Sequence, residues 1–163
     1  MTERKVITTG KKVKDFLLKD QDDEDFRLAA YRGNRILLSF HPLAWTPICA
    51  RQMKDLEKQH RVFQRLNTIA VGLSVDSVPC KAAWAKSLKL KHTRLLADFW
   101  PHGDVAKSVG ILRPEGFSER ANILLDETGK VVFTKVYPIR QTPDLSEILA
   151  VLATPAAGKR SAK

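Results

Sequence analysis

The segment from Pro42 to Cys49 combines a proline, a threonine and a cysteine in a spacing suited to thiol chemistry. It follows the apolar run 36–40 and leads into a sequence of helical character, so the order strand, loop, helix is predicted. Thr46 and Pro47 suit the N-cap region and the first position of that helix. We therefore expect Cys49 in the first helical turn, where unpaired N–H groups and the helix dipole favour a nucleophilic thiolate.

The second cysteine, Cys80, follows Ser77 and Pro79, which suit the N-cap and first turn of another helix. The same argument predicts an activated thiol there, although a small buried hydrophobic residue is the plain structural alternative. The two cysteines lie 31 positions apart and form no CxxC pair, which argues against an ordinary thioredoxin-type oxidoreductase. The four histidines are scattered without zinc-ligand spacing, and we expect neither a metal nor a cofactor.

Hydrophobic periodicity and turn residues predict an alternating order of strands and helices around these cysteines. The predicted strands lie near residues 16–18, 24–28, 36–40, 68–75, 94–97, 121–125 and 131–137, and the predicted helices lie near 49–66, 80–88, 104–109 and 144–152. The first two strands flank an acidic turn, residues 20–25, and Thr142 with Pro143 is expected to cap the last helix. The order predicts an α/β three-layer sandwich with a mixed central sheet.

The chain of 163 residues is 44% hydrophobic and 28% charged, as expected for one globular domain. We expect a flexible N-terminus over residues 1–10, a single domain over 11–153 and a disordered basic tail over 154–163. The net charge of +10 is concentrated at the ends, so no specific nucleic-acid partner is predicted. We expect no membrane association and a cytoplasmic location, because no apolar run has the length of a membrane span or a secretory signal.

The pattern Pro42-x-x-x-Thr46-x-x-Cys49 resembles the signature of the peroxiredoxins of the AhpC/TSA family. The similarity is nearest to the branch related to AhpE and the bacterioferritin-comigratory proteins, and it covers roughly residues 10–153. Further agreement comes from the segments 13–18, 72–77, 98–103 and 118–120. The resemblance implies a thioredoxin-like fold with an N-terminal β-hairpin, and thiol-dependent reduction of hydrogen peroxide and organic hydroperoxides.

By this resemblance, Cys49 is the nucleophile that attacks the peroxide and becomes a sulfenic acid. The hydroxyl of Thr46 orients the peroxide, and Pro42 shields the sulfur from water. The active-site arginine of the family falls on Arg120, whose guanidinium would favour the thiolate and stabilise charge on the breaking O–O bond. Gln52 stands where many relatives carry an acidic residue, and its neutral amide can still hydrogen-bond the arginine.

Cys80 is expected to be the resolving cysteine, which forms a disulfide with Cys49 after oxidation. The alternatives are a one-cysteine peroxiredoxin that uses an external thiol, a redox-sensing thiol–disulfide exchange protein, or a non-enzymatic binding protein on the same scaffold. The partners implied are a peroxide substrate, a reductant such as thioredoxin, glutaredoxin or a low-molecular-weight thiol, and a second copy in a homodimer. His41, next to the motif, is expected to be structural.

Overall fold

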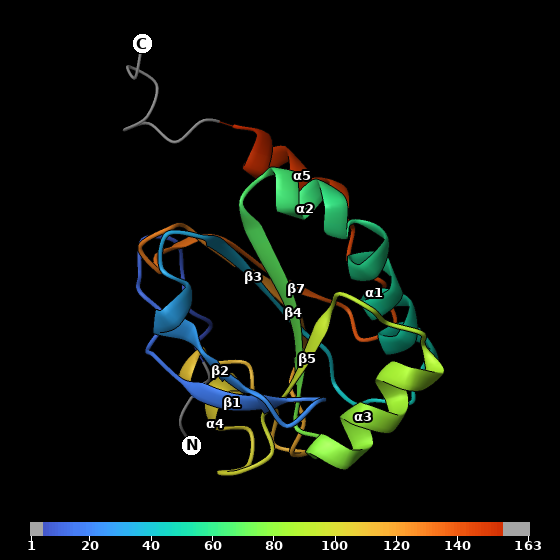
Figure 1. Ribbon diagram of the computed structural model, residues 1–163. Coiled ribbons are helices and arrows are strands. Elements are labelled where there is room, and N and C mark those ends of the chain that lie inside the picture. The colour runs from blue at the N-terminus through green and yellow to red at the C-terminus, as the bar shows by residue number, and fades with distance from the viewer. Residues whose placement is uncertain (1–4, 155–163) are drawn as a thin grey trace.

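The computed structural model describes residues 5–154 of the chain, and a seven-stranded mixed sheet lies at its centre (Figure 1). The strand order across the sheet is β2-β1-β5-β4-β3-β6-β7. The strands are β1 (Leu17–Asp20), β2 (Asp25–Arg27), β3 (Arg35–Phe40), β4 (Thr68–Ser74), β5 (Arg94–Ala97), β6 (Arg120–Leu125) and β7 (Val131–Tyr137). The helices are α1 (Pro47–Lys58), α2 (His60–Arg65), α3 (Val78–Ser87), α4 (Asp104–Ser108) and α5 (Leu145–Ala153), with a short 3-10 helix η1 (Leu28–Tyr31).

Strands β3, β4 and β5 pair in parallel, whereas β6 and β7 extend the sheet in antiparallel fashion on one side. The antiparallel hairpin of β1 and β2 continues the other side, where β1 pairs with β5. These pairings confirm the predicted mixed sheet and the N-terminal hairpin. Because parallel strands end at the same edge of a sheet, the segments after β3, β4 and β5 all leave from one edge.

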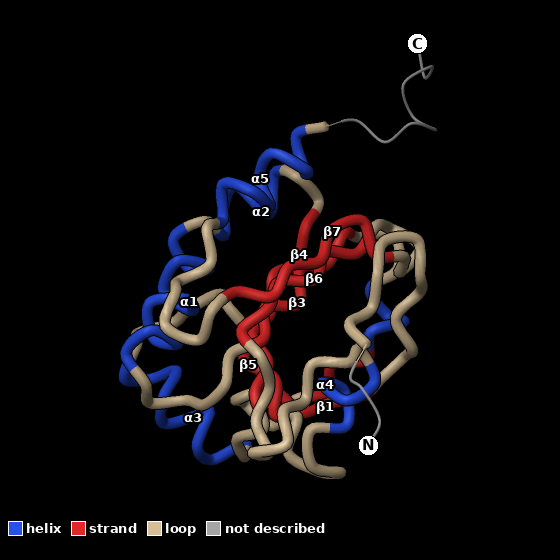
Figure 2. The backbone as a smooth tube through the Cα atoms, turned by 180° about the vertical axis from the view of Figure 1, so that it is seen from behind, coloured by secondary structure: helices blue, strands red, loops and turns tan. Residues whose placement is uncertain are grey.

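Helices cover both faces of the sheet, which confirms the three-layer architecture (Figures 1 and 2). Helices α1, α2, α3 and α5 lie on one face, and α4 with the N-terminal segment lies on the other. Each face has its own apolar cluster: Met53, Phe63, Trp84 and Ile148 belong to the first, and Phe26, Leu38, Val105 and Ile123 belong to the second.

The alternation of side chains along the strands decides which residues face α1. In β3, Leu37 packs in the cluster on the α1 face, whereas Leu38 packs on the opposite face. Ser39 therefore points toward α1, because side chains two residues apart share a face. In β6 the same alternation places Arg120 and Asn122 on the face of Leu124, which also belongs to the α1 side.

Some predicted boundaries are wrong. The helix expected over residues 49–66 starts at Pro47 and is interrupted at Gln59, where φ is −95° and ψ is 8°, so α1 and α2 are separate helices. The apolar periodicity runs through this break because Leu56 and Phe63 pack in the same cluster. The last helix is capped by Asp144, whose side chain accepts a hydrogen bond from the Ser146 N–H, and not by the preceding threonine and proline.

Residues 5–10, the described part of the N-terminal segment that was expected to be flexible, are hydrogen-bonded to the domain. The Ile7 N–H donates to the Val109 carbonyl at 3.0 Å, and the Gly10 N–H donates to the Val131 carbonyl at 2.8 Å. Val6 and Ile7 also pack against the second apolar cluster. Burial of these two side chains explains the attachment. The rest of this segment, and the expected basic tail beyond residue 154, lie outside the described residues.

Candidate active site

Cys49 lies in the first turn of α1, as the sequence predicts. Thr46 is the N-cap residue with an extended backbone (φ −110°, ψ 149°), and Pro47 opens the helix. The Cys49 side chain is completely buried in the cluster between α1 and the sheet. The thiol is therefore placed at the positive end of a twelve-residue helix, away from bulk water.

Arg120 contacts the thiol from the opposite side of this site. It is the first residue of β6, is 3% exposed, and donates from Nη1 to Cys49 Sγ at 3.3 Å. The same nitrogen donates to Gln52 Oε1 at 2.8 Å, and Nε donates to the Ile139 carbonyl at 2.9 Å. The fold thus brings together a thiol and a guanidinium that lie 71 positions apart in the chain.

A side chain and a backbone carbonyl of β3 hold Gln52 in place. Gln52 Nε2 donates to Ser39 Oγ at 2.8 Å and to the Phe40 carbonyl at 3.1 Å. Ser39 Oγ in turn donates to Asn122 Oδ1 at 2.8 Å, and these two residues are directly opposite in the β3–β6 register. Sequence reasoning did not single out Ser39 or Asn122, although a polar residue inside an apolar strand is a signal that a buried hydrogen-bond partner exists.

The loop between β3 and α1 is fixed by its own hydrogen bonds. The Thr46 hydroxyl donates to the Leu43 carbonyl at 2.8 Å, so Thr46 occupies the predicted N-cap position of α1 without a side-chain hydrogen bond to the helix. Its oxygen keeps lone pairs that can accept a hydrogen bond from a bound molecule. Pro42 is buried at the start of the loop, and the Ala44 N–H donates to Asp76 Oδ2 at 2.8 Å.

Cys80 lies at the start of α3, where Ser77 Oγ accepts a hydrogen bond from the Cys80 N–H at 3.3 Å and so confirms the predicted cap. The expected activation of this thiol is wrong for the observed conformation. Burial raises the pKa of Cys80, and the nearby Asp76 carboxylate raises it further. Cys80 Sγ donates to Asp76 Oδ1 at 3.8 Å, and both cysteines are free.

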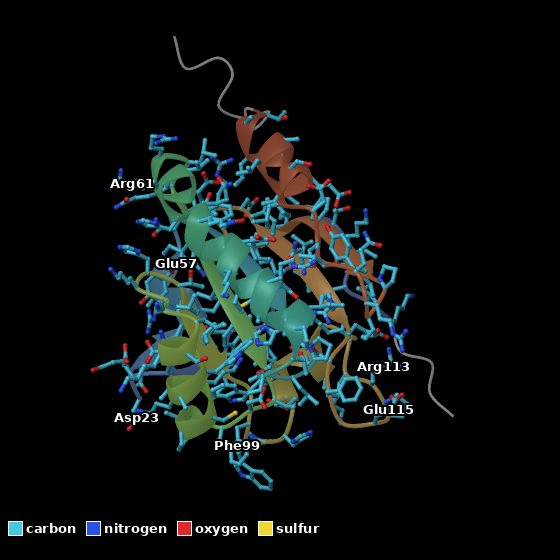
Figure 3. All side chains as sticks on the ribbon, turned by 90° about the vertical axis from the view of Figure 1, so that its right-hand side faces the viewer. Asp23, Glu57, Arg61, Phe99, Arg113 and Glu115 are labelled. Atoms are coloured by element: carbon cyan, nitrogen blue, oxygen red, sulfur yellow. The ribbon has the colours of Figure 1, made fainter. Side chains whose placement is uncertain are left out.

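Three aromatic side chains near the same sheet edge are exposed. Trp45 in the loop before α1 is 55% exposed, and Phe99 and Trp100 after β5 are 52% and 81% exposed. Figure 3 shows Phe99 projecting away from the body of the molecule. These aromatics lie outside the hydrogen-bonded group of Cys49, Arg120 and Gln52.

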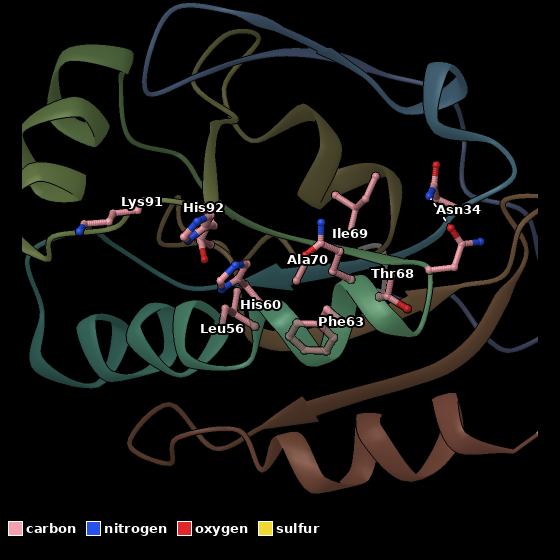
Figure 4. A pocket seen from close by; sticks show the side chains of 12 residues that line it. Asn34, Leu56, His60, Phe63, Thr68, Ile69, Ala70, Lys91 and His92 are labelled. Atoms are coloured by element: carbon pink, nitrogen blue, oxygen red, sulfur yellow. Dashed lines mark hydrogen bonds between the residues drawn. The ribbon is translucent and has the colours of Figure 1, made fainter.

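A separate cleft of about 600 Å³ lies beside α2 and the segment before β5 (Figure 4). Its lining includes His60 and His92, whose rings stack with centroids 3.6 Å apart. None of the residues that line it belongs to the predicted site. Within residues 5–154 there is also no group of three or more His, Cys, Asp or Glu side chains arranged to hold a metal ion.

A buried helix-start thiol held against a strand-borne arginine on a thioredoxin-like sheet defines the class of peroxiredoxins, which are thiol peroxidases. Comparison with known proteins agrees. The model of the AhpC/TSA family matches residues 9–134, and the chain belongs to this family. Its activity is therefore that of a thiol-dependent peroxidase, and a peroxide is its substrate.

Individual relatives support the same assignment. Alkyl hydroperoxide reductase E of Mycobacterium tuberculosis is 32% identical over 133 residues, which cover 80% of this chain and 86% of the relative. The reduced 2-Cys peroxiredoxin of Plasmodium vivax is 26% identical with a TM-score of 0.82, covering 88% of this chain and 79% of that one. The peroxidoxin BcpB of Mycobacterium tuberculosis is 25% identical with a TM-score of 0.77, covering 93% and 97%.

No helix in the described part of the chain has the length and apolar character to cross a membrane.

Proposed function

We propose that Cys49 is the peroxidatic residue and that Arg120 is its catalytic partner. The observation that carries this proposal is the contact of 3.3 Å between Arg120 Nη1 and Cys49 Sγ at the start of α1. The Cys49 thiolate attacks one peroxide oxygen, the O–O bond breaks, and an S–OH group forms on Cys49. The other oxygen leaves with the bonding electrons and takes up a proton, which gives water or an alcohol.

Arg120 acts on the charge that moves during this step. As the O–O bond breaks, negative charge passes from sulfur to the leaving oxygen, and a guanidinium fixed beside the sulfur stabilises this charge without reorganisation. The hydrogen bonds from Arg120 to Gln52 and Ile139 keep its planar group in one orientation. Gln52 adds no negative charge to this buried site, so the positive charge of Arg120 is directed toward the sulfur.

Thr46 and Pro42 shape the space in which the peroxide binds. The Thr46 hydroxyl already donates to the Leu43 carbonyl, so its oxygen is oriented to accept the O–H of a peroxide. Pro42 is buried and has no N–H, and it excludes water from the sulfur without competing for hydrogen bonds. Both roles rest on the position of these residues in the loop between β3 and α1.

We further propose that Cys80 resolves the sulfenic acid as an intramolecular disulfide. The parallel strands β3 and β4 end at the same sheet edge, and each leads into a helix that starts near one of the cysteines. A disulfide requires the two Cα atoms to approach within about 7 Å, so the first turn of α1 or α3 must unwind. Unwinding of α3 also separates Cys80 from Asp76, which removes the carboxylate that raises the pKa of its thiol.

Mass spectrometry after one equivalent of peroxide tests both proposals. The reduced wild type is expected to give a monomer lighter by two hydrogen atoms, with peptides containing Cys49 and Cys80 linked. The Cys80→Ser variant is expected to stop at sulfenic acid on Cys49, or at sulfinic acid with excess peroxide. Sulfenic acid on Cys49 of the wild type, with Cys80 still free, would show a one-cysteine enzyme that depends on an external thiol.

The reductant and the homodimer remain predictions from the family resemblance. Turnover with thioredoxin, glutaredoxin or a small thiol identifies the reductant, and light scattering of the eluted protein gives the oligomeric state.

A further inference from the structure

Two basic side chains form a buried contact behind the candidate active site, and the proposed reaction does not use them. His41 and Lys81 are both completely buried, and His41 Nε2 lies 2.8 Å from Lys81 Nζ. His41 follows the last residue of β3 and directly precedes Pro42. Lys81 follows Cys80 in the first turn of α3. The contact therefore joins the start of the active-site loop to the helix that carries the second cysteine.

The geometry of this contact limits the total charge that His41 and Lys81 can carry. A nitrogen–nitrogen distance of 2.8 Å is a hydrogen bond, which needs a proton on one nitrogen and a lone pair on the other. In one state, the Lys81 ammonium donates to a neutral His41 imidazole. In the other state, both side chains are neutral, and either the amine or the imidazole N–H is the donor. The two side chains cannot both be protonated at this distance. The pair therefore carries one positive charge or none, and it changes between these states by taking up one proton.

Groups from each surrounding element face the pair. They are Cys80 on α3 itself, Asp76 after β4, Asp98 after β5, Arg120 on β6 and Cys49 on α1. Burial lowers the pKa of Lys81 to about 7, although the carboxylate of Asp76 and the sulfur of Cys49 oppose this effect. Burial also lowers the pKa of His41 well below its ordinary value, and the charge of Lys81 lowers it further. Because burial and the charge of Lys81 both lower the pKa of His41, we assign the shared proton to Lys81.

A neighbouring aromatic ring can stabilise the positive charge of the protonated pair. The ring of Trp84 lies 5.6 Å from Lys81 Nζ, within the range of a cation–π interaction, and it packs 5.3 Å from the His41 ring. His41 is also next to Arg120 across the sheet, because the last paired residues of β3 and β6 are Phe40 and Ala121. A charge on the pair is thus placed in the same desolvated region as the thiol.

We propose that His41 and Lys81 form a positioning pair that holds one proton behind the active site and thereby favours the Cys49 thiolate. The inference rests on the proposed role of Cys49. A positive charge on the pair attracts the thiolate, and the thiolate in turn strengthens proton binding by the pair, since coupling between two sites is reciprocal. At a pH at which the pair is protonated, its positive charge adds to that of Arg120. At a pH at which the pair is neutral, it contributes no charge.

Peroxide consumption by the reduced protein, followed between about pH 5.5 and 8.5, tests the effect on rate. We compare the wild type with Lys81→Met, which cannot carry the proton, and with Lys86→Met, which removes an exposed charge from the same helix. The ratio of wild-type to Lys81→Met rate constants is expected to be about ten at the acid end and to approach one at the alkaline end. Lys86→Met is expected to follow the wild type throughout. A ratio that does not change with pH would overturn the proposal.

The Lys81→Gln variant covers the case in which Lys81→Met fails to fold, because its amide still donates to His41 without carrying a charge. It is expected to give the same ratio as Lys81→Met, and the wild-type pH profile in this variant would overturn the proposal.

Nuclear magnetic resonance tests the coupling without any peroxide. The side-chain carbon signal of Lys81 is followed against pH in the reduced wild type and in Cys49→Ser, which has no thiolate. The midpoint for Lys81 is expected to fall by at least about half a pH unit in Cys49→Ser. Equal midpoints would refute the coupling. A wild type that shows the coupling but consumes no peroxide would instead refute the proposed role of Cys49.

Discussion

Arg120 donates one hydrogen bond to Gln52 at 2.8 Å, from the same nitrogen that contacts the sulfur of Cys49. Gln52 is itself held by the sheet through Ser39 and the Phe40 carbonyl. One side of the guanidinium is therefore fixed through an amide on α1, and the sulfur lies on the same helix one turn earlier. Gln52 is therefore the residue that orients the guanidinium of Arg120 toward the sulfur of Cys49.

Gln52→Ala is expected to lower the rate of peroxide consumption by roughly ten-fold, because a guanidinium without its amide partner samples other orientations. The free energy of unfolding is expected to fall by about 1–3 kcal/mol, because the variant leaves buried partners unsatisfied. Stopped-flow kinetics and chemical denaturation measure the two effects. Gln64→Ala on α2, where the side chain is exposed, is the control and should change neither. An unchanged rate in Gln52→Ala would show that Arg120 holds its orientation without the amide.

Arg120→Met is expected to reduce the rate by about 10²–10³, because the lost charge acts mainly on the transition state. The burial of Arg120 adds a second effect that the sequence did not predict. Gln52 Oε1 and the Ile139 carbonyl lose their donor, so the melting temperature should fall as well. Rates must therefore be measured well below the melting temperature of the variant. Arg61→Met, an exposed arginine on α2, should behave as wild type. Wild-type kinetics in Arg120→Met would remove the arginine from the mechanism.

Cys49→Ser is expected to abolish peroxide consumption and to leave the fold intact, because serine is nearly isosteric but is a far weaker nucleophile. Circular dichroism checks the fold, and loss of peroxide from solution measures the activity. Cys80→Ser is the matched comparison, and it should still consume one equivalent of peroxide in a single turnover. If Cys49→Ser retains more than a small fraction of the activity, another group is the nucleophile.

Glu57 gives a prediction for acid stability. Burial acts to raise the pKa of Glu57, but hydrogen bonds from His92 and from the backbone N–H groups of Lys91 and Thr93 outweigh it and lower the pKa to about 2. A carboxylate whose pKa is lowered in the folded state stabilises the protein at pH values above the ordinary pKa of that carboxyl group. This stabilisation is lost as the pH falls from about 4.5 toward 2.

Glu57→Gln is therefore expected to lower the melting temperature by roughly 5 °C at neutral pH, since hydrogen bonds to a charged acceptor are lost. The difference from wild type should shrink as the pH falls through this range. Thermal melts at a series of pH values measure it, with Asp22→Asn as an exposed control. A difference that stays constant down to the lowest pH would mean that the charge of Glu57 does not contribute.

The sequence predicted the architecture well where local signals were strong. The order of strands and helices, the bounds of β5 and β7, and the Ser77 cap of α3 follow from periodicity and capping residues. The boundary between α1 and α2 was missed because the apolar pattern continues across Gln59. The Asp144 cap was missed because the last helix was predicted to begin at residue 144, whereas it begins at Leu145 and Asp144 is its N-cap.

The sequence by itself determined the chemistry available at the site: a thiol at a helix start, preceded by a proline and a threonine in a recognised spacing. Only the tertiary structure decided which distant groups meet that thiol. The contact of Arg120 with Cys49 depends on antiparallel pairing of β3 with β6, and the Ser39–Asn122 hydrogen bond depends on the register of that pairing. Likewise, the raised pKa of Cys80 and the burial of the His41–Lys81 pair depend on the packing of α3 against the sheet edge. Local sequence fixes backbone preference, whereas desolvation and charge proximity are properties of the packed chain.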